Sequence, residues 1–146
     1  MYERILITTD GTALSKKAVA AGLTLAAKLD AEVFAYMAVP HYPSMYFEGA
    51  VVLTPAETAR IEKDWTHQAQ SVVDAVREQA TAKHVMATAI IGHGEVAQGI
   101  ISAAKKHKCD VIVMASHGRK GISRILLGSE TLDVLTHSHI PVLVLR

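Results

Sequence analysis

Residues 5–12 read Ile5-Leu6-Ile7-Thr8-Thr9-Asp10-Gly11-Thr12, an apolar run that passes directly into polar residues. A short, continuous apolar run of this kind is typical of a strand buried on both faces of a parallel sheet. Four more apolar runs follow along the chain, at residues 33–39, 87–91, 111–114 and 142–145. The sequence therefore predicts five strands, and the first, fourth and last are continuous enough to be buried on both faces.

Helical patterns fill the intervals between these runs. Apolar residues recur at spacings of three and four over about residues 14–29, 56–84, 96–108 and 129–136. Strands that alternate with helices in this way predict an α/β architecture, with a parallel sheet and right-handed crossover connections.

Length and composition limit the possible classes of protein. A chain of 146 residues has room for one domain, residues 1–146, and half of its residues are hydrophobic. The net charge of +1 excludes a nucleic-acid binder that works by bulk charge. No apolar run approaches the ~18 residues that a membrane span needs.

Two further expectations concern the setting of the protein and its cysteine. We expect a cytoplasmic protein, because the first strand begins without a signal-peptide pattern. We expect the one cysteine, Cys109, to be a small buried thiol.

Two loops of the predicted sheet carry polar residues and glycines. In an open parallel sheet, ligands bind beyond the carboxyl ends of the strands, where the strand order reverses. Residues 8–12 follow the first strand, and residues 115–121 follow the fourth. Gly128 then leads into a helix in which Ser129 is an N-cap or first-turn residue. The free backbone amides of a helix start favour an anion, so the sequence predicts a phosphate site formed by Ser129, Glu130 and Thr131.

The glycine spacing resembles a known nucleotide-binding signature, that of the universal stress protein family. The signature is a glycine, two residues, a second glycine, nine residues, and then a glycine followed by serine or threonine. This chain has Ala115-Ser116-His117-Gly118, nine residues, and then Gly128-Ser129. The resemblance covers the whole chain, from Ile5-Leu6-Ile7 with Thr9-Asp10 to the closing segment 136–145.

The resemblance implies a fold and a ligand. The fold is a Rossmann-like, adenine nucleotide alpha hydrolase-like sheet of five parallel strands in the order 3-2-1-4-5, with helices on both faces. The ligand is ATP, or AMP or ADP, with Mg²⁺ or Mn²⁺ bound alongside it. The site residues that it implies come from four segments: Thr8, Thr9 and Asp10; Met37; Met114, Ala115 and Gly118; and Gly128, Ser129, Glu130 and Thr131.

Their roles follow from the same resemblance. The two threonines line the pocket, Met37 borders the adenine, and Met114 and Ala115 contact the base or the ribose. Asp10 lies beside the ribose and phosphates and helps to hold the metal. The phosphates are wrapped by glycine, serine and threonine: Gly118, Gly128, Ser129 and Thr131.

Two positions depart from the signature. Ala115 replaces the first glycine, and alanine is tolerated in an extended backbone but resists the left-handed conformation by roughly 1 kcal/mol. Glu130 adds a carboxylate directly after Ser129. Either this carboxylate points away along the helix, or its charge is offset by Arg119, Lys120 or a metal ion.

Three other patterns are interpreted structurally. The segment from Gly92 to Ala97 matches a dinucleotide fingerprint in its letters, but it follows the wrong strand and predicts a turn and a helix start. The histidines lack ligand spacing and are predicted to lie on the surface, with His117 alone in a candidate loop. A hydrolase triad of Ser116, His117 and Asp10 is discounted, because adjacent residues usually point apart.

Two segments bear on partners. The connection from Pro40 to Pro55 is long, and it is either a lid or contact surface or a solvated insertion. The last strand is apolar and nearly terminal, so it forms a sheet edge that a second copy could cover. Members of the family also commonly pair through this strand. We expect a homodimer formed through residues 141–145.

The leading hypothesis is a cytoplasmic stress-response regulator that binds ATP and has little or no catalytic activity. One alternative is a dimeric regulatory scaffold of the same fold that binds no nucleotide and acts on an unknown protein partner. Another is a slow ATPase in which Asp10 positions the metal or a water molecule.

Overall fold

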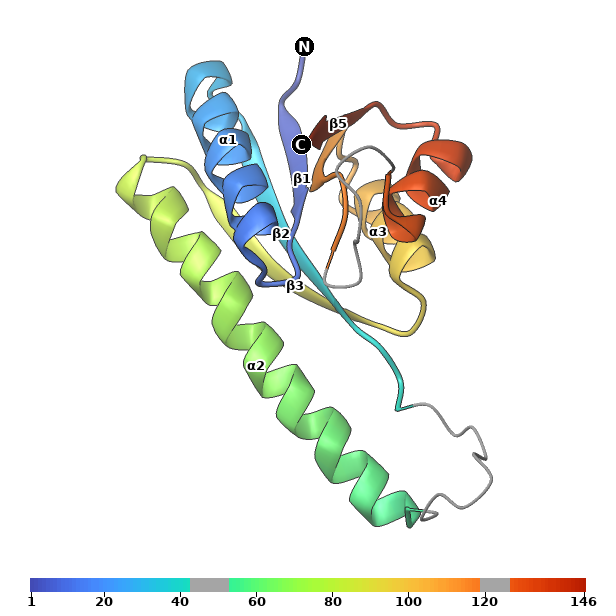
Figure 1. The fold of residues 1–146 in the computed structure, drawn as a ribbon. Coiled ribbons are helices and arrows are strands. Elements are labelled where there is room, and N and C mark those ends of the chain that lie inside the picture. Colours follow the sequence, from blue (N-terminus) through green and yellow to red (C-terminus); the bar gives the residue numbers. More distant parts are fainter. Residues whose placement is uncertain (43–52, 119–126) are drawn as a thin grey trace.

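The computed structural model describes residues 1–42, 53–118 and 127–146, and strands alternate with helices through them (Figure 1). In chain order the elements are β1 (Arg4–Thr8), α1 (Ala13–Leu29), β2 (Glu32–Val39), α2 (Pro55–Ala82), β3 (Ala87–His93), α3 (Val96–Lys106), β4 (Val111–Ala115), α4 (Ser129–His137) and β5 (Val142–Leu145). Each lies where the sequence predicts a strand or a helix. The α/β prediction is therefore confirmed.

The five strands form one parallel sheet in the order β3-β2-β1-β4-β5. β1 lies at its centre, where Ile5 pairs with Val33 of β2 on one side and with Val111 of β4 on the other. The predicted order is confirmed. Because the order reverses between β1 and β4, the segments that follow these two strands leave the sheet side by side.

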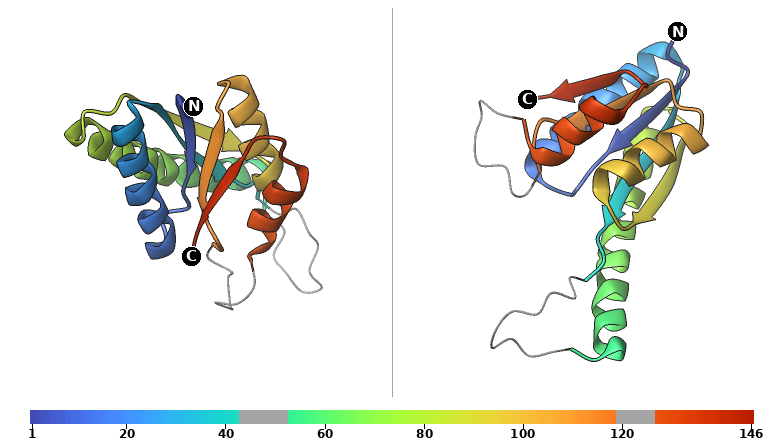
Figure 2. Two further views of the ribbon diagram at one scale, coloured as in Figure 1. Left: turned by 90° about the horizontal axis from the view of Figure 1, so that it is seen from above. Right: turned by 90° about the vertical axis from the view of Figure 1, so that its right-hand side faces the viewer.

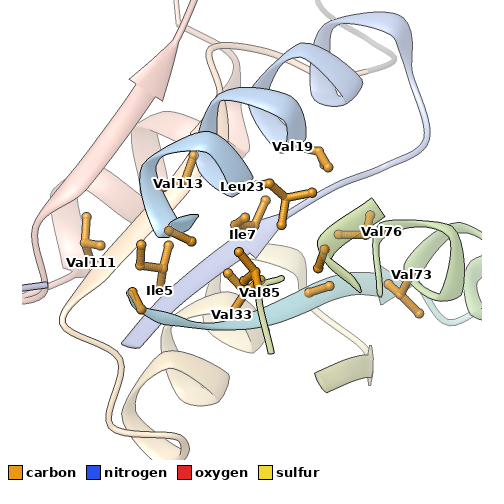
Figure 3. Close-up of a cluster of buried hydrophobic side chains, with 14 residues drawn as sticks. Ile5, Ile7, Val19, Leu23, Val33, Val73, Val76, Val85, Val111 and Val113 are labelled. Carbon is orange, nitrogen blue, oxygen red and sulfur yellow. The ribbon is translucent and has the colours of Figure 1, made fainter. Parts of the chain in front are cut away.

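Helices cover both faces of the sheet, as the two views in Figure 2 show. α1 and α2 lie over a core that includes Ile5, Ile7 and Val33 (Figure 3). α3 and α4 lie over a second core that includes Leu6 and Ile112. Neighbouring residues of β1 thus point into different cores, and this is why Ile5-Leu6-Ile7 is apolar at every position.

β5 differs from the central strands. Leu143 is 43% exposed, and the other residues of the strand are only partly buried. The expectation that this strand is buried on both faces is therefore wrong. The physical reason is its place at the edge of the sheet, with β4 as its one neighbouring strand.

α2 is longer than the sheet beneath it, and its amino-terminal part projects beyond the body of the molecule (Figure 1). Its start is well defined: Thr54 and Glu57 form a capping box, and Pro55 occupies the first turn. Its buried side chains all lie farther along the helix, from Ala69 to Ala80. Residues 43–52 of the long connection lie outside the described residues. The prediction that this connection is either a lid or contact surface or a solvated insertion falls on these residues.

The single cysteine confirms its predicted place. Cys109 is buried in the core under α3 and α4. Burial raises the pKa of its thiol to about 11, which keeps it un-ionised near neutral pH. Among the described residues, no helix combines the length and the apolar character needed to cross a lipid bilayer.

Candidate functional site

A cavity of about 260 Å³ opens at the carboxyl ends of β1, β2 and β4. Nine of the predicted site residues line it: Thr8, Thr9, Asp10, Met37, Met114, Ala115, Gly118, Glu130 and Thr131. Gly128 and Ser129 are not among the lining residues, although they directly precede Glu130 at the start of α4. The structure thus brings the predicted segments together around one hollow.

The turn between β1 and α1 fixes the carboxylate of Asp10. Its Oδ1 accepts hydrogen bonds from the Thr12 amide at 3.0 Å and from the Thr12 hydroxyl at 2.6 Å. Thr12 is itself the N-cap of α1 and accepts a bond from the Ser15 amide. Gly11 has a φ of +79°, which a glycine adopts without strain. The position of Asp10 therefore depends on the start of a helix.

The loop after β4 approaches this carboxylate closely. A Cβ added to Gly118 would lie 2.8 Å from Asp10 Oδ2, closer than side-chain atoms normally pack. Glycine at this position lets the backbone of one loop lie against the side chain of the other. Asp10 and Gly118 are far apart in the sequence, and they lie close together because the strand order reverses between β1 and β4.

α4 begins at the same edge, with Gly128 as its N-cap and Ser129 as its first helical residue. The first hydrogen bond within the helix runs from the Leu132 amide to the Gly128 carbonyl, so the three preceding amides have no partner inside the helix. The Gly128 amide donates to the Ser116 carbonyl, and a Cβ on Gly128 would lie 3.0 Å from the Cα of His117. Gly128 thus lets the helix start close to the end of β4.

The hydroxyls at this helix start make local contacts. Ser129 Oγ donates to Glu130 Oε2 at 3.2 Å. Thr131 is 2% exposed, and its hydroxyl donates to the Ala115 carbonyl at 2.9 Å. The Thr131 side chain therefore ties α4 to the end of β4, while its backbone amide remains one of the first-turn donors.

Ala115, which stands at the first glycine position of the signature, adopts a backbone conformation that suits alanine. It is the last residue of β4 and pairs with Leu145 of β5. It is not among the residues of positive φ, so its methyl group meets no backbone strain. Alanine is compatible with the cavity at this position. Arg119, Lys120 and Gly121 lie outside the described residues.

Ser116 and His117 correct a prediction. Ser116 Oγ and His117 Nδ1 form a hydrogen bond of 3.0 Å, so the expectation that these side chains point apart is wrong. Both residues follow the end of β4, where the strict alternation of strand side chains no longer applies. His117 lines the cavity, whereas Ser116 is 5% exposed and is not among the lining residues.

The apolar lining of the cavity includes residues that were not predicted, besides Met37, Met114 and Ala115, which were. Tyr36, Val96 and Ile100 line it, from β2 and α3. Burial raises the pKa of the Tyr36 hydroxyl. A Cβ on Gly92 or on Gly99 would overlap that hydroxyl, so both glycines make room for the tyrosine. The glycines at 92 and 94 therefore serve packing and a turn, since Gly94 has a φ of +101° directly before α3.

Comparison with known proteins agrees with this geometry. The model of the universal stress protein family matches residues 1–146. The chain belongs to the universal stress protein family. Universal stress protein MJ0531 of Methanocaldococcus jannaschii is 34% identical over all of this chain and 83% of its own length. Universal stress protein YxiE of Bacillus subtilis is 29% identical over the full length of both chains.

Solved structures of the family share the fold. Universal stress protein UspA from Lactobacillus plantarum superposes with a TM-score of 0.85 at 23% identity, over 99% of this chain and 98% of its own. A universal stress protein in complex with cAMP has a TM-score of 0.71 at 23% identity, over 99% and 97% of the two chains. One from Archaeoglobus fulgidus in complex with dAMP has a TM-score of 0.66 at 14% identity, over 99% and 98%.

The charged side chains that line the cavity in the described residues are carboxylates. Asp10 and Glu130 both line it, and the described lining residues include no lysine or arginine. Mg²⁺ in nucleotide sites is held by one or two carboxylates together with the phosphates. These two carboxylates fit that pattern. No cluster of three or more metal-binding side chains occurs in the described parts of the chain.

Proposed function

We propose that this chain binds an adenine nucleotide, ATP with Mg²⁺ or Mn²⁺, in the cavity between β1 and β4, and acts in the cytoplasm as a nucleotide-dependent regulator of a stress response. One observation carries the proposal. The carboxylate of Asp10, the backbone at Gly118 and the uncapped start of α4 converge on a hollow whose opposite end is apolar.

The polar end suits the phosphates. The amides of Ser129, Glu130 and Thr131 precede the first bond within α4, and the N-cap residue, Gly128, provides no side-chain cap. A helix start with unused donors and a positive dipole end attracts an anion. The hydroxyl of Thr131 bonds to Ala115, so its contribution to phosphate binding is through the backbone.

The apolar end suits the base. Met37, Ala38 and Ile100 line it, and a purine ring gains affinity by burying its faces against such side chains. Related proteins of this fold are known in complex with cAMP and with dAMP, and both ligands carry adenine. These complexes support adenine as the base; the number of phosphates is our inference from the uncapped helix start.

The metal ion has a specific electrostatic role in this proposal. Two carboxylates beside a polyphosphate repel it, and a divalent cation reverses that repulsion. Asp10 is the residue we assign to the metal, because its carboxylate is already held in place by Thr12. Glu130 is the second carboxylate within the cavity wall.

The nucleotide acts here as a ligand that changes the protein's conformation or contacts. Ser116, whose hydroxyl is hydrogen-bonded to the His117 ring, does not line the cavity in which we place the nucleotide. The slow ATPase remains the competing proposal, with Asp10 as the residue that positions the metal or the water. Phosphate release by wild type and by Asp10→Asn distinguishes the two.

We also propose that the protein is a homodimer that pairs through β5 and residues 141–145. β5 is an edge strand, and Leu143 exposes an apolar side chain on it. Lysine on an edge strand blocks pairing, so Leu143→Lys is expected to give a monomer in light scattering. Leu29→Lys is the matched control, because Leu29 is also 43% exposed but lies at the end of α1. A dimer that persists in Leu143→Lys would contradict the proposal.

Calorimetric titration of nucleotide-free protein with ATP and Mg²⁺ tests the nucleotide proposal. Gly128→Asp places a side chain against the backbone of His117 and a negative charge at the start of α4, so ATP binding is expected to disappear. Ser102→Asp adds the same charge on an exposed part of α3 and is expected to bind ATP as wild type does. Wild-type protein that gives no heat with ATP would refute nucleotide binding and favour the regulatory scaffold.

A further inference from the structure

A second cavity, of about 270 Å³, lies between α1 and α2 on the face of the sheet that these helices cover. Val19 of α1 and Val76 of α2 form its buried floor, and both side chains are labelled in Figure 3. Val72 and Ala75 extend this apolar wall along α2. Its volume lies just below the ~300 Å³ at which typical small-molecule sites begin, and a short aliphatic chain fits within it.

The polar groups around this cavity are few and of one charge. Among its described lining residues, Lys16 is the one that carries a charge, and Ser71 and Gln79 are the uncharged polar residues on α2. Within the described parts of the chain, no carboxylate lies within the 4.0 Å of an ion pair with Lys16. An apolar hollow with one unpaired cation at its rim favours a ligand with an aliphatic body and one negative charge.

The start of α1 strengthens this preference. Its first turn holds no acidic residue, and Lys16 follows directly. A cation near the amino-terminal end of a helix adds to the positive end of the helix dipole, and the Asp10 carboxylate at this helix start offsets part of that charge. A ligand carboxylate beside Lys16 would offset the positive charge that remains.

Gly11 forms part of the same wall. It carries no side chain, and the place that a Cβ would take is 3.5 Å from Val72 Cγ2. Its φ of +79° favours glycine, so this side of the cavity stays open. Thr9 also lines this cavity as well as the first one, so the two cavities share the turn that carries Asp10.

We propose that the cavity between α1 and α2 is a binding site for a small aliphatic monocarboxylate, whose carboxylate pairs with Lys16 and whose chain lies on Val19, Val72 and Val76. This site does not depend on the nucleotide, and it can be tested in nucleotide-free protein.

The test is a titration of ¹⁵N-labelled protein with hexanoate, followed by amide chemical shifts at constant ionic strength. Saturable shifts are expected at Val19, Val72 and Val76. Acetate has the charge without the chain, and 1-hexanol has the chain without the charge, so each is expected to bind at least about fivefold more weakly. Shifts that map to Met114 and Ile100 in the first cavity, or no saturable shifts, would overturn the proposal.

Two variants separate this site from nonspecific binding. Lys16→Gln is expected to weaken hexanoate binding about fivefold, the effect of an exposed ion pair, while Lys17→Gln on the same helix leaves it unchanged. Ala75→Phe fills the cavity from an exposed position and is expected to abolish binding without unfolding the protein. Hexanoate binding that is equal in wild type, Lys16→Gln and Ala75→Phe would show that the ligand lies elsewhere.

Discussion

Two helices, α1 and α4, begin at the same edge of the sheet, yet their first turns are satisfied differently. At the start of α1, neighbouring side chains bond the backbone: Thr12 caps the helix, and Asp10 accepts two hydrogen bonds from Thr12. The start of α4 has glycine as its N-cap and no side-chain cap. One loop thus fixes a carboxylate, whereas the other leads into a helix whose N-cap residue has no side chain to bond the first-turn amides.

Apart from Gly128→Asp, the largest effect on ATP binding is expected from forcing the loops after β1 and β4 apart. Gly118→Val places a branched side chain within contact of the Asp10 carboxylate, and overpacking of this kind costs on the order of 2 kcal/mol. Because ATP is proposed to need both loops in their present positions, a similar loss of binding free energy is expected, or about 30-fold in affinity. Calorimetry measures the affinity, and thermal unfolding shows whether the fold persists. Unchanged ATP affinity in a folded variant would mean that the nucleotide does not contact both loops.

Metal removal tests the electrostatic part of the comparison. Chelation is expected to lower the affinity for ATP at least about tenfold, because Asp10 and Glu130 then face the phosphates without a cation. Adenosine has no phosphates, so its affinity is expected to change less than about twofold. Equal effects on the two ligands would contradict the assignment of the carboxylates to the phosphate end.

Asp10→Asn removes the charge but keeps an oxygen that accepts from Thr12. The expected result is about a fivefold loss of affinity for ATP with Mg²⁺. A malachite-green assay of phosphate release accompanies the titration. Steady release by wild type that disappears in the variant would favour the slow ATPase over the regulator.

The smallest effects compare the two helix starts directly. Thr12→Ala removes the cap of α1 and is expected to lower the free energy of unfolding by about 1 kcal/mol. Ser129→Ala removes no cap, and its effect on stability is expected to be below about 0.5 kcal/mol. Urea unfolding measures both. Equal losses in the two variants would show that α4 depends on Ser129 as α1 depends on Thr12.

The central strands could be predicted from sequence because burial on both faces leaves a continuous apolar run. The two loops could be predicted from the polar residues and glycines that follow these runs. In Ile5-Leu6-Ile7, the two isoleucines pack in the core under α1 and α2, and the leucine packs in the core under α3 and α4. The same pattern misleads at β5, since Leu143 is apolar yet exposed at the sheet edge. Apolar character shows that a surface prefers burial, and it does not say whether this chain or a second copy buries it.

The apolar end of the site could not be predicted in the same way. Tyr36, Gly92 and Gly99 come from β2, β3 and α3, and their fit depends on how these elements pack. The hydrogen bond between Ser116 and His117 depends on the backbone after β4, where no periodic rule applies. Sequence spacing locates loops, whereas packing decides which side chains meet in them.

The most direct test follows the amide chemical shifts of both helix starts while ATP with Mg²⁺ is added to ¹⁵N-labelled, nucleotide-free protein. The largest saturable shifts are expected at Ser129, Glu130 and Thr131, with smaller shifts at Ala13 and Leu14 in the first turn of α1. Shifts that are largest in α1, or that leave the start of α4 unchanged, would contradict a nucleotide site built on the uncapped helix.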